Sequence, residues 1–543
     1  MKSHLIVASL CASSVLVAQT QTGVQYPQSK KIEQVDDYFG AKVADPYRWL
    51  EDLDSAETKE WVDAQNRATF AYLERIPARR SIKERLTELW NYERYGTPSK
   101  RKGYYVFTKN DGLQNQSVLY KTDRLDGSPE VLLDPNKLSA DGTVALSGRS
   151  FSEDGRYMAY ATSASGSDWM QWQVREVKTA TDRPDLVKWS KFSGAAWMND
   201  GSGFYYSRFD APKEGESLKG LNKNQKVYFH ALGKTQDQDR LVYERPDKPD
   251  WGFGADVTDD GRFLIIYQSE GTEPKNRLFI QDVKQPGGRI APFLDQFDAE
   301  YEVVGNDGER FYIQTDKDAP RGRLVAIDSR NPAPANWSAL IPQGSGKEVM
   351  ASVSMVNNRF VVIWRTDAHD KIKIYGLDGT FQNEVTLPTI GTVGVSGRRK
   401  DDELFYAFTS FTYPTTVYQY DFSSRTSNVF KQPKVDFKSD DYETSQVFYS
   451  SKDGTRVPMF LTHRKGLKRD GQNPTYLTGY GGFNITITPS FSPATIAWLD
   501  MGGIHAVANL RGGGEYGREW HDAGRLHHKR NVFDDFIAAA EYL

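Results

Sequence analysis

A repeated pattern of short strands constrains this chain more than any other feature. Between about residue 100 and residue 430, strand-like segments that end at an acidic or turn residue recur at steps of 44 to 55 residues. Asp-Gly pairs precede alternating aromatic strands, as in EDGRYMAYA and DDGRFLIIY, which is a hairpin signal. A period of this length predicts a seven-bladed β-propeller; a β-sandwich or several small β domains are the alternative. The equivalent positions are Leu119, Val174, Tyr228, Leu278, Leu324, Ile374 and Tyr418.

The sequence on both sides of this repeat has a different character. Residues 31–90 place apolar residues at helical intervals, with Asp54 and Ser55 as a candidate helix cap, and predict helices. After residue 440 a hairpin is followed by two strands, PTYLTGY and GIHAVANL, with glycine-rich loops and helix-length segments. The second strand lacks clean alternation, as expected for a strand covered on both faces. The succession predicts the first part of an α/β domain.

The final residues, NVFDDFIAAAEYL, predict an amphipathic helix. Its apolar residues recur at spacings of one, three and four, and they are expected to form a stripe lying against a core. No glycine or proline follows to end the helix, and we interpret the chain as a piece of a longer one. The stripe consists of Val532, Phe533, Phe536, Ile537, Ala540 and Leu543.

Charge and the first residues limit the classes of partner and the location. The chain has 69 Lys and Arg against 72 Asp and Glu, a net charge of -3, so we expect no nucleic-acid partner. MKSHLIVASLCASSVLVAQTQ has the outline of a secretory signal peptide, which we assign to residues 1–20. The protein is therefore expected to be periplasmic or secreted, with no membrane association after signal removal. Cys11, the single cysteine, falls in this segment, which excludes disulfides from the mature chain.

Two glycine-rich loops follow the predicted buried strands. In the first, TGYGGFN, three glycines let the backbone turn sharply while Tyr480 and Phe483 project from it. In α/β-hydrolases the loop at this place supplies an oxyanion-hole donor, an effect of about 3 to 4 kcal/mol, and a tyrosine hydroxyl can donate. A tight turn without a catalytic role is the alternative. The second loop, RGGGEYG, predicts backbone packed closely against another part of the chain.

The histidines after the second loop do not have metal-ligand spacing. No two of His521, His527 and His528 are three or four residues apart, so we interpret them as solvated side chains. The sequence predicts no metal site and no cofactor.

Several motifs, taken together and in order, resemble the prolyl oligopeptidase family of serine peptidases. The resemblance runs from about Ile32 to Leu543 and implies a seven-bladed β-propeller inserted into an α/β-hydrolase domain that is incomplete at the C-terminus. It divides the chain into a signal peptide (1–20), an N-terminal helical segment of the hydrolase domain (21–90), the propeller (91–437) and the first, truncated part of the catalytic domain (438–543). The motifs are DPYRWLED, WVDAQN, GLQNQSVLY, TSASGSDW, TSFTYP, SKDGTRVPMF, YGGFN and RGGGEYG.

The resemblance also implies a reaction and site residues. It implies cleavage of short peptides after proline by a monomer, with folded proteins excluded by the propeller. Tyr480 falls on the family's oxyanion tyrosine, Phe483 on an apolar wall of the proline pocket, and Phe192 on a propeller residue that lines the substrate cavity. For Phe192, a place in the core of a blade is the alternative. Related oligopeptidases that cut after Lys or Arg usually lack a phenylalanine at position 483.

The nucleophile of such an enzyme is not found in this sequence. The fold needs a serine in G-x-S-x-G, then an acid, then a histidine, and no G-x-S-x-G occurs in residues 1–543. All three triad members are expected beyond Leu543, so the parent protein is predicted to be a serine endopeptidase and this chain to be inactive. A non-catalytic, propeller-based peptide-binding protein is the alternative from a different class.

Overall fold

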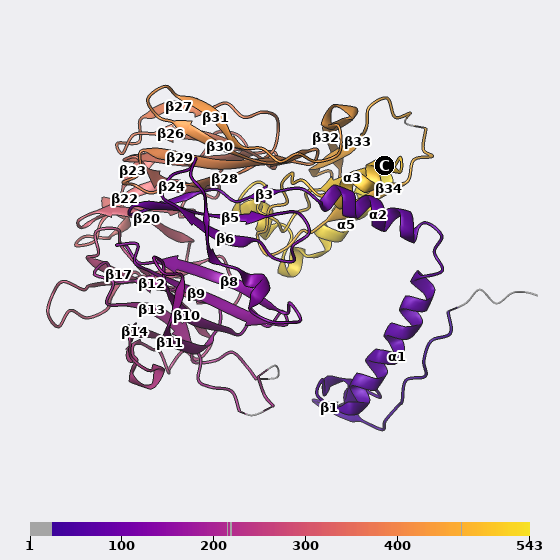
Figure 1. Ribbon diagram of the computed structural model, residues 1–543, viewed down its shortest axis with the longest axis horizontal. Helices are drawn as coiled ribbons and strands as arrows, with labels where there is room; N and C mark the ends of the chain where they lie inside the picture. Colours follow the sequence, from indigo (N-terminus) through magenta and orange to yellow (C-terminus); the bar gives the residue numbers. More distant parts are fainter. Residues whose placement is uncertain (1–23, 214, 218–219, 469) are drawn as a thin grey trace, which may run out of the picture. The chain divides into compact units, whose positions relative to one another are not determined.

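The computed structural model describes residues 24–543, except residues 214, 218, 219 and 469 (Figure 1). The predicted signal peptide lies outside the described residues. The chain divides into two compact units, one up to Arg85 and one from Leu86 onward. The short 3₁₀ helices are η1 (Arg48–Glu51), η2 (Pro135–Lys137), η3 (Gln236–Gln238), η4 (Pro334–Asn336), η5 (Ser439–Asp441) and η6 (Leu526–His528).

The first unit contains a hairpin as well as helices. Strands β1 (Val35–Tyr38) and β2 (Ala41–Ala44) pair antiparallel, and helix α1 (Ala56–Leu73) follows. The prediction of helix is therefore wrong for residues 35–44, because Phe39 and Gly40, both at positive φ, form a two-residue turn that closes a hairpin. The predicted cap is confirmed: the Ser55 side chain accepts a hydrogen bond from Thr58 N at 3.2 Å. Helix α2 (Arg79–Trp90) runs from the first unit into the second.

Seven antiparallel sheets follow one another between residues 94 and 431 of the described chain. The first two are β3 (Arg94–Tyr95), β4 (Ser99–Arg101), β5 (Tyr104–Asn110), β6 (Val118–Thr122), β7 (Glu130–Leu133); and β8 (Val144–Phe151), β9 (Tyr157–Ala164), β10 (Met170–Glu176), β11 (Thr181–Ser190). The third and fourth are β12 (Ala196–Trp197), β13 (Gly203–Arg208), β14 (Lys226–Ala231), β15 (Arg240–Tyr243); and β16 (Trp251–Val257), β17 (Phe263–Glu270), β18 (Asn276–Asp282), β19 (Ala291–Leu294). The fifth is β20 (Tyr301–Asp307), β21 (Arg310–Thr315), β22 (Arg323–Asp328), β23 (Ser338–Ile341). The last two are β24 (Val349–Val356), β25 (Arg359–Thr366), β26 (His369–Tyr375), β27 (Phe381–Val385); and β28 (Thr392–Ser396), β29 (Glu403–Ser410), β30 (Tyr413–Asp421), β31 (Thr426–Lys431).

The positions chosen as equivalent in the sequence are equivalent in the structure. Each lies in the third strand of its sheet, namely β6, β10, β14, β18, β22, β26 or β30. The Asp-Gly signals lie in the turns between first and second strands, with Gly155, Gly201, Gly261 and Gly308 at positive φ. The repeat seen in the sequence therefore corresponds to a strand order and to turns that recur from sheet to sheet.

Neighbouring sheets pack face to face through apolar side chains. Phe263, Ile265 and Leu278 of the fourth sheet share one buried cluster with Phe311 and Val325 of the fifth. The first and last sheets also touch: the rings of Tyr105 in β5 and Phe405 in β29 have centroids 6.5 Å apart. Lys100 Nζ donates to Asp402 Oδ1 at 2.7 Å and the Tyr105 hydroxyl to Glu403 Oε2 at 2.7 Å. Each sheet is built from one continuous stretch of chain, so the first and last sheets meet through contacts such as these and not by sharing a strand.

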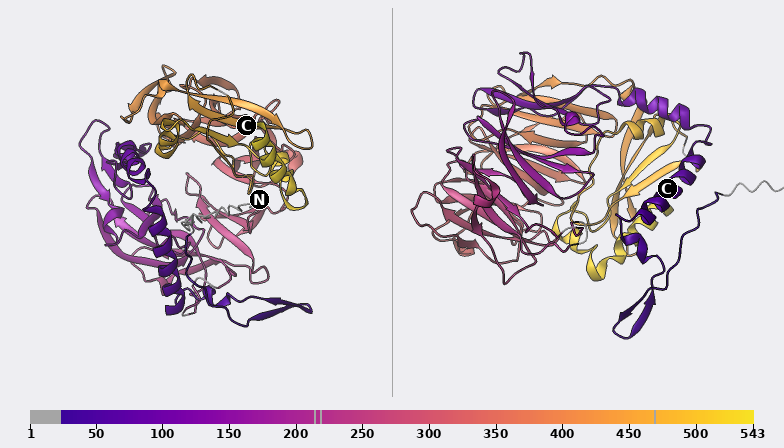
Figure 2. Two further views of the ribbon diagram at one scale, coloured as in Figure 1. Left: turned by 90° about the vertical axis from the view of Figure 1, so that its right-hand side faces the viewer. Right: turned by 60° about the horizontal axis from the view of Figure 1, so that its bottom comes forward.

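The segment after residue 440 forms a separate sheet with helices. Its strands are β32 (Tyr442–Ser450), β33 (Arg456–Arg464), β34 (Thr475–Gly479) and β35 (Ile504–Ala508), in the order β32-β33-β35-β34, with β34 and β35 parallel. The helices are α3 (Pro493–Asp500), α4 (Arg518–Asp522) and α5 (Arg530–Tyr542). The segment gathers on one side of the propeller sheets (Figure 2). Both predicted strands are present as β34 and β35, but the predicted burial is confirmed only for β35: β34 is the edge strand of the sheet, and its residues are exposed or half-buried.

The prediction of which face of the last helix is buried is wrong. Val532, Asp535 and Ala539 of α5 face the core, whereas Phe533 is 60% exposed and Ile537 is 56% exposed. Two polar contacts set this rotation: Asp535 pairs with Arg511, and its carbonyl accepts from the Tyr449 hydroxyl at 2.9 Å. A buried charge must keep its partner, so within the described residues the face of α5 that carries Asp535 is the one turned toward the core.

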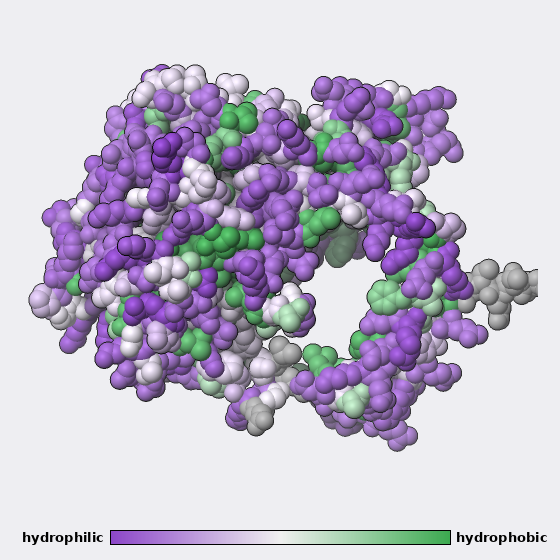
Figure 3. Space-filling model, viewed as in Figure 1, coloured by the Kyte–Doolittle hydropathy of each residue, from purple (hydrophilic) through white to green (hydrophobic). Residues whose placement is uncertain are grey.

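The visible surface in Figure 3 is largely hydrophilic, with small scattered apolar areas. None of the helices in the described residues combines the length and the apolar character that a bilayer crossing requires.

A buried histidine lies between two carboxylates at the second and third sheets. His230 is fully buried, with Nδ1 2.7 Å from Asp239 Oδ1 and Nε2 3.2 Å from Asp185 Oδ1. Burial disfavours the imidazolium, but hydrogen bonds and charge from the two aspartates outweigh it and raise the pKa of His230 to about 9. The folded protein therefore holds this proton more tightly than the unfolded chain does.

We predict that His230 makes stability depend on alkaline pH. Because the pKa of His230 is higher in the folded protein than in the unfolded chain, its protonation stabilises the fold fully at pH values below about 6.5. This stabilisation is lost as the pH rises through about 9, and the free energy of unfolding then falls by up to about 3 kcal/mol. Thermal or urea unfolding between pH 6 and pH 10 should show this decline, and His230→Gln should flatten it. His527→Gln, at an exposed position, is the matched control. An unchanged pH slope in H230Q would contradict the assignment.

Candidate active site

The loop after β34 exposes two aromatic side chains because its backbone presses against the core. At Gly481, with φ of 61°, a Cβ would lie 2.5 Å from Val532 Cγ1 and 2.9 Å from Leu510 Cβ. Only glycine allows this approach. The side chains of Tyr480 and Phe483 point away, are 50% and 61% exposed, and have ring centroids 6.5 Å apart. The structure thus places the two predicted site residues side by side.

The second glycine loop lies directly beneath the first. A Cβ at Gly512 would lie 2.7 Å from Gly481 O, and one at Gly514 would lie 2.7 Å from Asn484 O. Asn484 N donates to Gly512 O at 3.1 Å. The close packing predicted for RGGGEYG is confirmed, and the surface it packs against is the loop that carries Tyr480.

Helix α4 places the side chain of a histidine against these loops. His521 is 6% exposed, so its interpretation as a solvated side chain is wrong; His527 and His528 are exposed. Its Nδ1 lies 2.7 Å from Gly512 O, the same carbonyl that accepts from Asn484 N. From the other side, Lys529 Nζ donates to Gly481 O at 2.8 Å. Each glycine loop therefore has one backbone carbonyl held by a cationic or imidazole side chain.

A buried arginine connects these loops to the rest of the sheet. Arg511 is 4% exposed, and its Nη2 lies 2.6 Å from Asp535 Oδ1 in α5. Its Nη1 lies 2.6 Å from Asp453 Oδ2 in the turn between β32 and β33. The hydrogen bond from Arg511 lowers the pKa of Asp453 to about 2. The end of β35, helix α5 and this turn are thereby joined.

The two aspartates that hold Arg511 should differ sharply in importance. Asp535→Ala leaves a guanidinium buried with one partner and should cost about 3 to 5 kcal/mol of unfolding free energy. Asp453→Ala removes a partner whose side chain is 47% exposed and should cost about 1 kcal/mol or less. Urea unfolding of the two variants measures both values. Equal losses would show that the Asp535 pair is not the main support of the loops.

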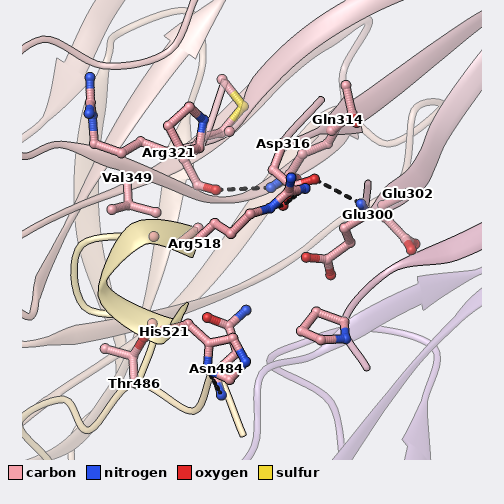
Figure 4. A pocket seen from close by; sticks show the side chains of 18 of the residues that line it. Glu300, Glu302, Gln314, Asp316, Arg321, Val349, Asn484, Thr486, Arg518 and His521 are labelled. Atoms are coloured by element: carbon pink, nitrogen blue, oxygen red, sulfur yellow. Dashed lines mark hydrogen bonds and ion pairs between the residues drawn. The ribbon is translucent and has the colours of Figure 1, made fainter. Parts of the chain in front are cut away.

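A cavity of about 480 Å³ adjoins the glycine loops (Figure 4). One wall comes from the fourth, fifth and sixth propeller sheets and includes Glu300, Glu302, Gln314, Asp316, Arg321 and Val349. The other wall comes from the segment after residue 440 and includes Asn484, Thr486, Arg518, His521 and Arg525. Tyr480, Phe483 and Phe192 do not line this cavity, although Asn484 is next to Phe483 in the chain.

Ion pairs join the two walls of the cavity. Arg518 points from α4 toward Asp316, with Nε 2.6 Å from Asp316 Oδ2 (Figure 4). Arg525 Nη1 lies 2.5 Å from Glu273 Oε1. Glu300 and Glu302 have no ion-pair partner among the described residues. Burial raises the pKa of each of these two carboxyls to about 7. The propeller wall therefore carries acids that are only partly ionised at neutral pH.

Phe192 lies outside the blade core. It is 64% exposed, at φ of 52°, in the connection from β11 to β12. The corresponding connections after β19 and β23 both touch the segment after residue 440: Asp298 O accepts from Arg518, and Lys347 Nζ lies 4.6 Å from the Tyr516 ring. Phe192 is thus on the face of the propeller that carries this segment.

Sequence reasoning did not identify the residues of the cavity. Arg518 and Asp316 are 202 positions apart, and no motif spacing links them. Glu300 directly precedes β20 and Glu302 lies in it, a spacing of two that many solvent-facing residues share. His521 could have been suspected only from its place after the second glycine loop.

Comparison with known proteins agrees with this architecture. Residues 27–433 match the family model described as "Prolyl oligopeptidase, N-terminal beta-propeller domain", and residues 489–543 match "Prolyl oligopeptidase family". Prolyl endopeptidase from Elizabethkingia meningoseptica is 42% identical over 539 residues, covering 99% of this chain and 76% of the relative. Prolyl endopeptidase from Elizabethkingia miricola is also 42% identical, covering 100% of this chain and 76% of the relative.

Solved structures give the same result. A structure from a "Structural and Mechanistic Analysis of Two Prolyl Endopeptidases" matches with a TM-score of 0.89 and 37% identity, over 96% of this chain and 76% of that one. Prolyl oligopeptidase B from Galerina marginata, bound to a 25mer macrocyclization substrate, matches with a TM-score of 0.89 and 33% identity, over 95% and 76%. The chain belongs to the prolyl oligopeptidase family of serine peptidases.

Proposed function

We propose that this chain is the propeller and first catalytic portion of a serine endopeptidase that cleaves short peptides on the carboxyl side of proline. The observation that carries this proposal is the exposed pair Tyr480 and Phe483, held by two interlocked glycine loops in a member of the prolyl oligopeptidase family. The relatives named prolyl endopeptidase support the specificity for proline.

In this proposal the two aromatic residues have different tasks. The Tyr480 hydroxyl has no hydrogen-bond partner among the described residues, so it is free to donate to the oxyanion that forms during acyl transfer. Phe483 offers a flat apolar surface, which suits a pyrrolidine ring that has no N–H to satisfy. Phe192, exposed on the facing side of the propeller, is proposed to contact the substrate from there.

We also infer that the seven sheets are the blades of a seven-bladed propeller that excludes folded proteins. Contact between the first and last sheets and the shared apolar clusters support a closed ring. An oligopeptide is the proposed partner, and the protein is proposed to act as a monomer in the periplasm or outside the cell, without cofactor, metal or nucleic acid.

The nucleophile, acid and base are proposed to lie in sequence outside residues 1–543. The chain spans about three quarters of the length of the relatives it matches, with 76% covered. Structures of the Galerina marginata enzyme with substrate carry a serine, an aspartate or a histidine replaced by alanine. Strand β34 is an edge of its sheet, and Phe533 and Ile537 of α5 are exposed, so further chain has a strand and an apolar face to pack against.

Two alternative functions, cleavage after Lys or Arg and peptide binding without catalysis, make different demands on the site. An oligopeptidase that cuts after Lys or Arg would need acidic residues beside Phe483. The unpaired acids Glu300 and Glu302 line the neighbouring cavity, which Phe483 does not line, so they do not meet this requirement. A non-catalytic peptide-binding protein would use the same cavity without a nucleophile. The full coding sequence separates this last reading from a peptidase by the presence of G-x-S-x-G.

We predict that activity depends on the sequence outside this chain. Protein from the complete coding sequence should hydrolyse a chromogenic Gly-Pro substrate, and residues 24–543 alone should not. A chromogenic Gly-Arg substrate tests the alternative specificity. Turnover by residues 24–543 that a serine-directed phosphonate inhibits would contradict the proposal.

Within the complete protein, Tyr480→Phe should lower kcat by about 100- to 1,000-fold with little change in KM, because the hydroxyl acts only on the oxyanion. Tyr476→Phe is the matched control, since Tyr476 is 58% exposed on the preceding strand. Steady-state kinetics on the Gly-Pro substrate measures both. A Y480F enzyme with the kcat of Y476F would remove Tyr480 from the mechanism.

A further inference from the structure

We propose that Glu515 is the positioning residue of the oxyanion loop, holding the segment that follows Tyr480 and Phe483 so that the Tyr480 hydroxyl keeps its place. This inference rests on the proposed function, because it assigns Glu515 to the loop that the proposal makes catalytic. Glu515 belongs to the loop RGGGEYG. Close packing explains the glycines of this loop but not its buried carboxylate.

The Glu515 carboxylate reaches the far end of the loop segment. Its side chain is buried, the residue being 1% exposed, and Oε1 accepts from Ile487 N at 3.1 Å. The same oxygen lies 3.3 Å from Asn509 Nδ2, which donates to Ile487 O at 2.7 Å. Glu515 and Asn509 therefore hold both polar groups of one residue in the loop.

The glycines explain why this contact can form. The Glu515 side chain folds back over Gly513, where a Cβ would lie 2.2 Å from Oε2 and 2.8 Å from Ile485 O. At Gly514 a Cβ would meet Asn484 O at 2.7 Å and Thr486 Oγ1 at 2.9 Å. Residues 484–487 thus lie directly on residues 513–515. The glycines supply the flat surface and Glu515 supplies the hydrogen bond at its end.

The loop is then held at three places along its length. Gly481 is held against Leu510 and Val532, and its carbonyl accepts from Lys529. Asn484 N donates to Gly512 O, and Ile487 N donates to Glu515. Tyr480 and Phe483 lie among these contacts without a polar contact of their own among the described residues. Removing the Glu515 carboxylate leaves Ile487 N, at the far end of this segment, without its hydrogen-bond acceptor.

This contact does not need a negative charge. Burial raises the pKa of the Glu515 carboxyl to about 7, and Oε2 has no hydrogen-bond partner among the described residues. The charged and titratable groups facing it are Arg365, whose Nε donates to Asp370 at 2.8 Å, and Tyr516, whose hydroxyl donates to Asp367. Both are already engaged. A glutamine at position 515 keeps the accepting oxygen, so it should keep the function.

The test uses the complete protein and two independent readouts. Glu515→Ala should lower kcat by about 10- to 100-fold, since displacements of about 1 Å cost this much, while KM changes less than about twofold. Hydrogen–deuterium exchange should rise in the peptide covering residues 480–488. Glu515→Gln should restore kcat to within about threefold of wild type. Glu519→Ala, an exposed carboxylate four residues further on, is the matched control and should change neither readout.

The outcomes separate the two proposals. Unchanged kcat and unchanged exchange in E515A overturn the positioning role, as does a Gln variant as impaired as the Ala variant. Raised exchange with unchanged kcat, together with an unaffected Y480F, supports the positioning role and rejects the oxyanion role of Tyr480. If E515A does not fold, Asn509→Ala removes the donor to Ile487 O and should show the same loss of kcat and rise in exchange; wild-type values there overturn the inference.

Discussion

The direct contact between the backbones of two glycine-rich loops organises the site in this protein. Gly481 and Gly512 approach each other so closely that a Cβ on Gly512 would lie 2.7 Å from Gly481 O. Backbone packed against backbone leaves no room for rotamer adjustment, so the two loops behave as one layer. The charged pair Arg511 and Asp535 lies below this layer and fixes it to helix α5. The exposed aromatic pair above it follows from these constraints.

The propeller contributes the second half of the arrangement by supplying a charged wall. Its connections after β19 and β23 reach the segment after residue 440, and Asp316 and Glu273 pair with Arg518 and Arg525 across the cavity. These contacts are ionic and partly exposed, whereas the turn at Ala368 is fully buried against Phe411, Phe460 and Val507. The interface between the propeller sheets and the segment after residue 440 is thus buried and apolar at one end and polar around the cavity at the other.

Local signals were sufficient for much of the fold. The strand repeat located the third strand of every propeller sheet, and the Asp-Gly pairs located four turns, because both depend on residues close in sequence. Ser55 was found as a helix cap for the same reason. The predicted site residues Tyr480 and Phe483 are adjacent in the structure, while their catalytic roles stay a prediction. Residues 35–44 were missed because two turn residues at positive φ outweighed a helical pattern.

By itself, the sequence determined the repeating strands, the two glycine loops and the resemblance to one peptidase family, since each is written in neighbouring residues. Only the tertiary structure decided the face that helix α5 buries, the burial of His521 and the cavity with its paired and unpaired acids. The positions of Asp535, His521 and Arg518 each depend on a polar partner outside their own helix. The free energy of a buried charge or imidazole depends on that partner, and no local pattern encodes a partner 202 residues away.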